Sequence, residues 1–172
     1  PWEIVNSNQP NLTRAENLWL ALQQAQGEYM VVIPADLSTP LADIWALLRD
    51  LAINPNIELI LGNRLTDKKK YLHRKSSWHS TLENIILEKF KKDSTIATKI
   101  SDPLTPYWAL RKSSFQKILK SQNKPVLGWY YTPQLLKLAE ENKISIAELP
   151  IQSQKKTGSS IPLFKEYLRH LF

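Results

Sequence analysis

The sequence predicts an α/β fold with a mixed, mostly parallel sheet flanked by helices. Residues 29–33 form a continuous apolar run, and residues 57–61 form a mainly apolar run that contains Glu58. Both runs have the length of strands that helices cover on both faces. A segment with helical spacing, beginning near Thr39 and Pro40, separates the two runs. This order of strand, helix and strand predicts a parallel pair with a right-handed crossover. The continuous apolar pattern of residues 29–33 predicts a central strand.

The elements that precede the first apolar run are a short strand at residues 3–5 and a helix. A capping box formed by Thr13 and Glu16 begins that helix, and Gly27 ends it. Its predicted apolar face consists of Leu18, Leu22 and Ala25. The helix that follows the first run is expected to bury Ile44, Leu47, Leu48 and Leu51.

The second half of the chain continues the alternation of helices and strands. A helix with the apolar face Leu82, Ile85, Ile86 and Phe90 is expected first. The remaining predicted elements are a strand at 107–110, a helix at 115–119, a helix from Thr132 through Leu138, a strand at 144–149 and a short amphipathic helix at 162–172.

Composition narrows the classes of protein to which the chain can belong. Its 172 residues, with 42% hydrophobic and 23% charged, predict one domain that spans residues 1–172. The absence of Cys excludes a disulfide framework, a zinc-thiolate site and a cysteine nucleophile. No apolar run reaches the roughly 18 residues of a membrane-spanning helix.

The net charge of +7 suits an anionic partner, either a nucleic acid, a membrane surface or the phosphates of a small substrate. Much of the charge lies in residues 64–75 and at Lys155 and Lys156, where short runs of Lys also occur as plain solvated loops. The sequence has no recognisable recognition helix, RNA-binding sheet motif or zinc module, so we expect no nucleic-acid partner.

Polar residues follow the two predicted parallel strands. Asp36 comes after the first, and Asn63 and Arg64 come after the second. Ligands of open α/β sheets bind at the carboxyl ends of strands, so these residues mark the candidate site. The alternative for Asp36 is that it only orders the turn before the helix cap at Thr39, together with Ser38.

Several short segments follow one another in a recognisable order. They are Asn11–Ala15, Gly27–Tyr29, Ile33–Pro40, Gly62–Arg64, Asp102–Arg111, Gly128–Tyr131, Glu148–Pro150 and Gly158–Ser160. Together they resemble the motifs of the polyprenyl-phosphate branch of the family-2 glycosyltransferases, which includes dolichyl-phosphate mannose and glucose synthases. The resemblance implies a GT-A-like fold, the fold of nucleotide-diphospho-sugar transferases.

The activity that this resemblance implies is inverting transfer of a hexose from a nucleotide sugar to a polyprenyl or dolichyl phosphate, assisted by Mg²⁺ or Mn²⁺. It implies Asp36 as metal ligand and Asp102 as the acid beside the acceptor, where Asp102 acts as a base or orients the attacking oxygen. The residues that it implies for substrate binding are Arg14, Ser38, Arg64, Arg74, His79, Trp129 and Gln134.

Each of these residues also has a structural alternative. The cations could be ordinary exposed charges, Asp102 could order the turn before Pro103, and the aromatic residues at 129–131 could belong to the core.

The chain departs from the family pattern at several positions. Pro34 replaces the first acid of the family motif, Thr132 replaces an acid and Gln134 a glutamate. The family's opening strand, with its Pro-x-Tyr-Asn-Glu motif, does not occur before Glu3, so the implied sheet lacks that strand. The alternative function is therefore a catalytically impaired relative that serves in binding or as a scaffold.

The expected location is cytoplasmic. Lys165, Arg169 and His170, on the amphipathic segment at 162–172, permit peripheral contact with a membrane face. The sequence predicts no oligomeric state.

Overall fold

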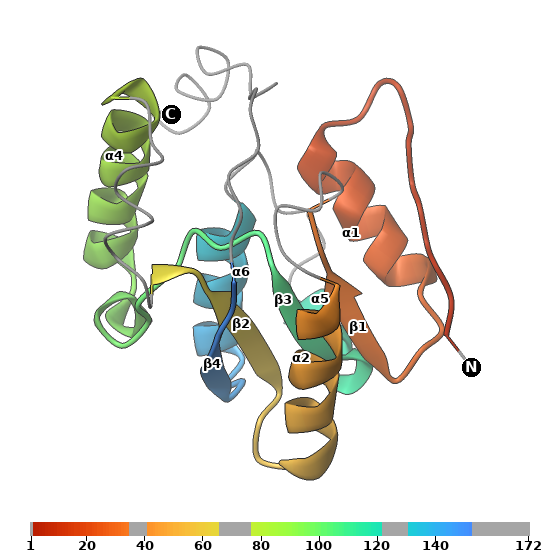
Figure 1. Ribbon diagram of the computed structural model, residues 1–172. Coiled ribbons are helices and arrows are strands. Elements are labelled where there is room, and N and C mark those ends of the chain that lie inside the picture. Colours follow the sequence, from red (N-terminus) through yellow and green to blue (C-terminus); the bar gives the residue numbers. More distant parts are fainter. Residues whose placement is uncertain (1, 35–40, 66–76, 122–130, 153–172) are drawn as a thin grey trace.

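The computed structural model describes residues 2–34, 41–65, 77–121 and 131–152, with residues 77–83 described by their backbone alone. Figure 1 shows a sheet between layers of helices. The elements in chain order are α1 (Arg14–Gln24), β1 (Tyr29–Val32), α2 (Ala42–Ile53), β2 (Leu59–Asn63), α4 (Ser77–Asp93), η2 (Thr95–Thr98), β3 (Trp108–Arg111), α5 (Lys112–Ser121), α6 (Tyr131–Glu141) and β4 (Ile146–Pro150).

The four strands form one mixed sheet in the order β1-β3-β2-β4. β3 pairs antiparallel with both β1 and β2, and β4 pairs parallel with β2. β1, β2 and β4 therefore point the same way, and β3 alone of the described strands points the other way. The mixed α/β architecture confirms the predicted fold class.

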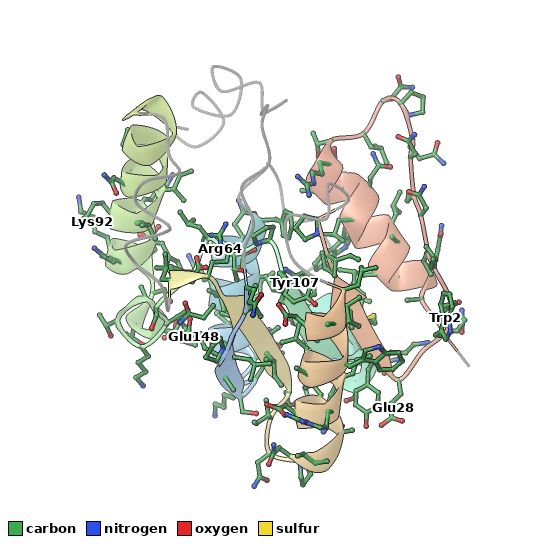
Figure 2. The ribbon with its side chains drawn as sticks, in the orientation of Figure 1. Trp2, Glu28, Arg64, Lys92, Tyr107 and Glu148 are labelled. Carbon is green, nitrogen blue, oxygen red and sulfur yellow. The ribbon has the colours of Figure 1, made fainter. Side chains whose placement is uncertain are left out.

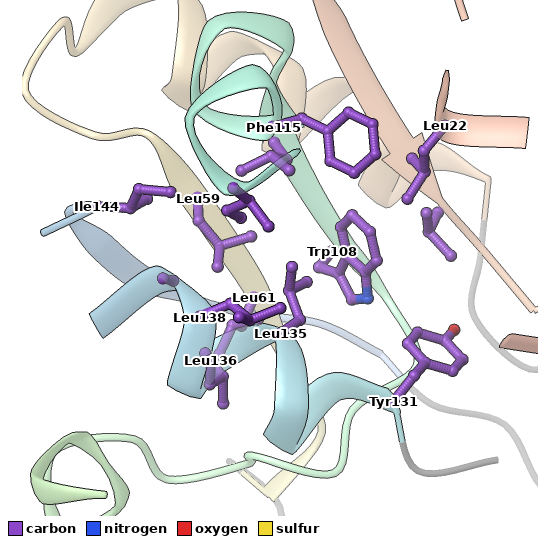
Figure 3. Packing of buried hydrophobic residues seen from close by; sticks show 14 of the residues in the cluster. Leu22, Leu59, Leu61, Trp108, Phe115, Tyr131, Leu135, Leu136, Leu138 and Ile144 are labelled. Atoms are coloured by element: carbon purple, nitrogen blue, oxygen red, sulfur yellow. The ribbon is translucent and has the colours of Figure 1, made fainter. Parts of the chain in front are cut away.

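Alternate residues of each strand enter two separate hydrophobic clusters, as the two-residue period of a strand requires. One cluster lies under α1, α5 and α6, where Trp19 meets Phe115 edge-on with ring centroids 5.1 Å apart. Figure 3 shows this cluster around Trp108, with Leu59 and Leu61 of β2 beside it.

The second cluster lies between the opposite face of the sheet and α2. Leu47 and Leu51 of α2 are fully buried there against Ile60, Tyr107 and Ala109. α2 crosses this face in Figure 1. The two clusters together explain why the strands read as continuous apolar runs, because both faces are covered.

The predicted capping box at the start of α1 is confirmed. The hydroxyl of Thr13 accepts a hydrogen bond from the backbone N–H of Glu16, and the Glu16 carboxylate accepts one from the Thr13 N–H at 2.7 Å. Of the predicted apolar face only Leu22 is fully buried, while Leu18 and Ala25 pack at its margin. Ala15 and Trp19, which were not predicted, complete the buried face.

Three expectations about the strands and helices are wrong. Residues 3–5 form no strand, and the Glu3 carboxylate instead accepts hydrogen bonds from the backbone N–H groups of Gln26 and Gly27. β1 lies at one end of the described sheet, not at its centre, because β3 inserts between it and β2. Ile85, predicted on the buried face of its helix, is 37% exposed, whereas Ile86 and Phe90 are buried as expected.

The predicted cap of the second helix at Thr39 and Pro40 lies outside the described residues, as does the predicted helix at 162–172. α2 itself begins at Ala42. Among the helices that the structure describes, none is long and apolar enough to cross a bilayer.

Candidate functional site

Four strand ends meet at one edge of the sheet. β1, β2 and β4 all have their carboxyl ends there, and the chain enters the amino end of the antiparallel β3 from residues 102–107. Open α/β sheets bind their ligands at this edge. Two predicted site residues, Arg64 after β2 and Asp102 before β3, therefore come to the same place although 38 positions separate them.

Arg64 and Asp102 form a two-pronged ion pair. Arg64 Nε donates to Asp102 Oδ2 at 2.7 Å, and Nη2 donates to Oδ1 at 2.8 Å. The backbone N–H of Arg64 also donates to Oδ2, at 3.0 Å. The side chains are 15% and 3% exposed, so solvent screens the pair weakly. This geometry fixes the plane of the guanidinium and engages both carboxylate oxygens.

Glu148, on β4, holds the segment that carries Asp102. Its Oε2 accepts the backbone N–H of Ser101 and its Oε1 accepts that of Asp102, both at 2.9 Å. Glu148 lies directly opposite Leu61 in the parallel pairing of β2 and β4. Figure 2 labels Arg64 and Glu148 near this end of β2.

A second contact anchors the same segment to α6. The hydroxyl of Thr132, at the start of α6, donates to the backbone carbonyl of Thr105 at 2.6 Å, and both residues are buried. The carbonyl of Asp102 accepts the N–H of Thr105 at 3.2 Å, which closes a turn. The backbone carbonyl of Asp102 thus closes a turn, while its side chain pairs with Arg64.

Two more predicted site residues lie in the first turns of helices: Arg14 in α1 and Gln134 in α6. Burial raises the pKa of Tyr131 to about 12, and the nearby positive charge of Arg14 acts in the opposite direction. Arg14 therefore lies close to the start of α6, where Gln134 is half-buried. Tyr131 belongs to the core and meets Trp108 edge-on at 6.4 Å, which confirms the structural interpretation for this aromatic residue.

Two aromatic residues next to the site carry buried polar atoms. The hydroxyl of Tyr107 and Nε1 of Trp108 have no hydrogen-bond partner among the described residues. Burial raises the pKa of Tyr107, and the negative charge of Asp43 adds to that effect. The Tyr107 phenol is therefore neutral across the physiological pH range.

The described residues do not form a metal site. Across 2–34, 41–65, 77–121 and 131–152, no group of three or more acidic or His side chains could hold an ion. Asp102 already gives both carboxylate oxygens to Arg64. The predicted ligand Asp36 lies outside the described residues, as do Ser38, Arg74 and Trp129. His79 is on α4 in the part described by its backbone alone.

Sequence reasoning missed two residues that shape the site. Glu148 lies in one of the segments that resemble the family, Glu148–Pro150, but the resemblance assigns it no role. Thr132 replaces an acid of the family pattern, and its hydroxyl ties α6 to the segment that carries Asp102. The segment match is the available signal for Glu148, and the place of Thr132 before Pro133, at the start of a predicted helix, is the signal for Thr132.

No protein-family model and no curated protein sequence matches the chain. Solved structures of similar shape do exist. A structure of glucosyl-3-phosphoglycerate synthase from Mycobacterium tuberculosis matches 94% of this chain with a TM-score of 0.56 and 15% identity. The same enzyme with bound Mn²⁺ and uridine-diphosphate-glucose matches 91% of the chain, with a TM-score of 0.55 and 15% identity.

Mannosyl-3-phosphoglycerate synthase from Rubrobacter xylanophilus is similar over 92% of the chain, with a TM-score of 0.54 and 12% identity. The chain spans about half of each of these proteins, between 48% and 55% of their length. At such low identity the likeness establishes the fold and leaves the activity open. The chain therefore has a GT-A-like fold, of the kind found in nucleotide-sugar glycosyltransferases.

Proposed function

We propose that this chain takes part in the transfer of a hexose from a nucleotide sugar to a polyprenyl or dolichyl phosphate. The observation that carries the proposal is the guanidinium of Arg64, held by Asp102 at the carboxyl edge of a GT-A-like sheet. Motif order along the chain supports the lipid-phosphate acceptor, and the sugar-nucleotide enzymes of similar fold support the donor class.

The reaction needs one bond to form and one to break. An oxygen of the acceptor phosphate attacks the anomeric carbon of the sugar. The bond from that carbon to the donor diphosphate breaks, and the nucleoside diphosphate leaves with the electron pair. A single displacement inverts the configuration. The attacking phosphate is already ionised at neutral pH, so this step requires positioned cations more than it requires a strong base.

Arg64 is the residue we assign to the acceptor phosphate. A guanidinium presents its donors in a planar fork that matches phosphate oxygens, and its orientation here is set by Asp102. Asp102 is then an orienting residue and not a general base, because both of its oxygens accept hydrogen bonds from Arg64. Arg14, near the start of α6, is assigned to the donor diphosphate.

The proposal includes a divalent metal ion, with Asp36 as its ligand. A nucleotide-sugar transferase stabilises the departing diphosphate with Mg²⁺ or Mn²⁺, which one or two carboxylates and the phosphates hold. Isothermal titration of uridine and guanosine diphosphate, with and without Mn²⁺, tests this part. Metal-dependent binding that Asp36→Ala abolishes is the expected result, and equal binding by the variant would exclude Asp36 as the ligand.

The acceptor class is tested separately by transfer assays. The chain is incubated with radiolabelled uridine-diphosphate-glucose or guanosine-diphosphate-mannose and either farnesyl phosphate or 3-phosphoglycerate. Label should move to farnesyl phosphate, and Arg64→Lys should reduce the rate because one ammonium cannot reproduce the fork. Transfer of label only to 3-phosphoglycerate would show that the acceptor is a soluble phosphate and not a lipid phosphate.

A catalytically impaired binding protein is the second candidate. Pro34, which ends the segment after β1, is buried and offers no oxygen ligand on its side chain where the family pattern has an acid. Thr132, where that pattern has another acid, gives its hydroxyl to the Thr105 carbonyl. Nucleotide binding without transfer in every acceptor assay would favour this candidate.

The same proposal places the chain at the cytoplasmic face of a membrane. A lipid-phosphate acceptor stays in the bilayer, so the protein has to reach it from the surface, and the basic residues at 165–170 suit that contact. Co-sedimentation with vesicles that contain anionic lipid, compared with neutral vesicles, tests the location.

A further inference from the structure

Glu148 makes a contact that lies outside the pairing of its own strand. Its carboxylate bridges two successive backbone N–H groups, with Oε2 on Ser101 and Oε1 on Asp102, both at 2.9 Å. The neighbouring pairs of β2 and β4 already hold β4 in the sheet, since Leu61 faces Glu148 and Asn63 faces Pro150. The side chain therefore acts on the segment before β3 and not on its own strand.

One of the two N–H groups that Glu148 binds belongs to Asp102, the residue that pairs with Arg64. The N–H of Asp102 is held by Glu148, and the carboxylate of the same residue receives Nε and Nη2 of Arg64 at 2.7 and 2.8 Å. Fixing the backbone of Asp102 sets the direction of its Cα–Cβ bond and so limits where its carboxylate can lie. β4 and the end of β2 are thus joined through this segment.

We propose that Glu148 is a positioning residue for acceptor binding, which acts through Asp102 to set the orientation of Arg64. This inference rests on the proposed function, because it assumes that Arg64 receives a phosphate. A glutamate suits the role because its two oxygens can accept two parallel N–H groups, which a single hydroxyl or amide oxygen does less well.

The charge balance of the group supports a positioning role over a merely stabilising one. Glu148 and Asp102 are both acidic, and the guanidinium of Arg64 pairs with Asp102. Two carboxylates in one small region repel each other, so a neutral side chain would satisfy sheet packing at lower electrostatic cost. The carboxylate is suited instead to holding two donors in a defined geometry.

The chain contains a matched control in Glu58. This residue lies just before β2, and its Oε2 accepts the backbone N–H of Ser145, just before β4, at 3.1 Å. Glu58 therefore ties the same two strands at their amino ends, away from Arg64. Glu58→Gln and Glu148→Gln make the same chemical change at opposite ends of one strand pair.

The experiment reads the position of Arg64 directly, by the exchange rate of its Nε–H proton in ¹H–¹⁵N spectra of the full chain. In Glu148→Gln the glutamine has one acceptor oxygen for two N–H groups, so we expect the Nε–H of Arg64 to exchange about tenfold faster. Binding of farnesyl phosphate should weaken by about the same factor. Glu58→Gln should change neither quantity.

The outcomes separate the two proposals. Unchanged exchange at Arg64 in a folded Glu148→Gln variant would overturn the positioning role. Faster exchange together with no binding of farnesyl phosphate by any variant or by the wild type would support the positioning of Arg64 and overturn the proposed acceptor. If Glu148→Gln does not fold, Glu148→Asp keeps the charge, draws it back by one methylene, and is judged by the same two readouts.

Discussion

Arg64 and Asp102 meet through three hydrogen bonds, two from the guanidinium at 2.7 and 2.8 Å and one from the Arg64 backbone at 3.0 Å. Asp102 is 3% exposed in its side chain, which makes this pair the least solvated ion pair that the described residues contain. Breaking such a pair costs more than forming it contributes, because the remaining charge stays buried.

Asp102→Asn should therefore destabilise the protein by about 3 kcal/mol. The amide of Asn offers one acceptor where Arg64 presents two donors, and it leaves the guanidinium without a counter-charge. Urea unfolding followed by circular dichroism measures the free energy of unfolding. Asp50→Asn is the control, because its pair with Arg49 is 3.4 Å long and Arg49 is 69% exposed, so a change below about 0.5 kcal/mol is expected. Equal losses in the two variants would contradict the buried role of Asp102.

Local patterns predicted the elements well, and the physical reason is that their determinants are local. The capping box at Thr13 and Glu16 depends on residues three positions apart, and it appears in the structure as predicted. The strands that begin at Tyr29 and Leu59 follow from apolar runs that both faces of the sheet bury.

Strand order could not be predicted in the same way. The insertion of β3 between β1 and β2 depends on contacts between residues about 50 to 80 positions apart, such as Met30 with Leu110 and Ile60 with Ala109. No local pattern encodes that pairing. The expectation of a strand at residues 3–5 failed because a short segment does not by itself supply a partner strand.

The candidate site could be predicted only in part, because it also depends on contacts between distant residues. Arg64 and Asp102 could each be chosen by their place next to strands, but their contact depends on the same insertion of β3. The role of Glu148 needed the register of β2 and β4, which brings its carboxylate beneath Ser101. Residues whose function passes through another residue leave little signal in one sequence.

Thr132→Val should weaken the link between α6 and the segment before β3. The variant keeps the shape of the side chain but removes the hydroxyl that donates to the Thr105 carbonyl at 2.6 Å in a buried position. A loss of about 1 to 2 kcal/mol in the free energy of unfolding is expected. Thr98→Val, at an exposed hydroxyl that donates to the Thr95 carbonyl, should cost much less. An unchanged free energy of unfolding in Thr132→Val would show that this hydrogen bond is not needed for stability.

Glu58 should give the stability a dependence on acidic pH. Burial tends to raise the pKa of its carboxyl, but hydrogen bonds from Lys117, the Ser145 N–H and Ser114 outweigh this and hold the pKa below its usual value of 4.5. A lowered pKa in the folded state means that the stabilisation is present above 4.5 and is lost as the pH falls through the folded value.

The difference in unfolding free energy between wild type and Glu58→Gln tests that dependence. At about pH 7 the wild type should be more stable by about 1 kcal/mol, a modest value because Lys117 is 54% exposed. As the pH falls below 4.5 and through the lowered pKa of the folded state, the difference should shrink, since Glu58 then becomes neutral like the glutamine. A difference that stays constant over this range would show that the charge of Glu58 is not what stabilises the wild type.

Gly62→Ala should destabilise the protein and disturb the site together. An added Cβ at Gly62 would lie 2.6 Å from Cδ1 of Tyr107 and 2.7 Å from Cδ1 of Ile151, both in the packed cluster against α2. Relieving such contacts requires side chains or backbone to move, at a cost of about 1 to 3 kcal/mol. Tyr107 cannot move freely because it is 1% exposed and its backbone carbonyl accepts the Gly62 N–H at 2.8 Å.

The displacement should reach Arg64, two residues further along the chain. We therefore expect Gly62→Ala to speed the exchange of the Arg64 Nε–H as well as to lower the thermal midpoint. Gly27→Ala is the control, since its added Cβ would approach only the Tyr29 carbonyl oxygen, at 3.3 Å, and lies far from Arg64 in the chain. A Gly62→Ala variant with a lowered midpoint but unchanged exchange would mean that the ion pair with Asp102 holds Arg64 independently of the packing beneath it.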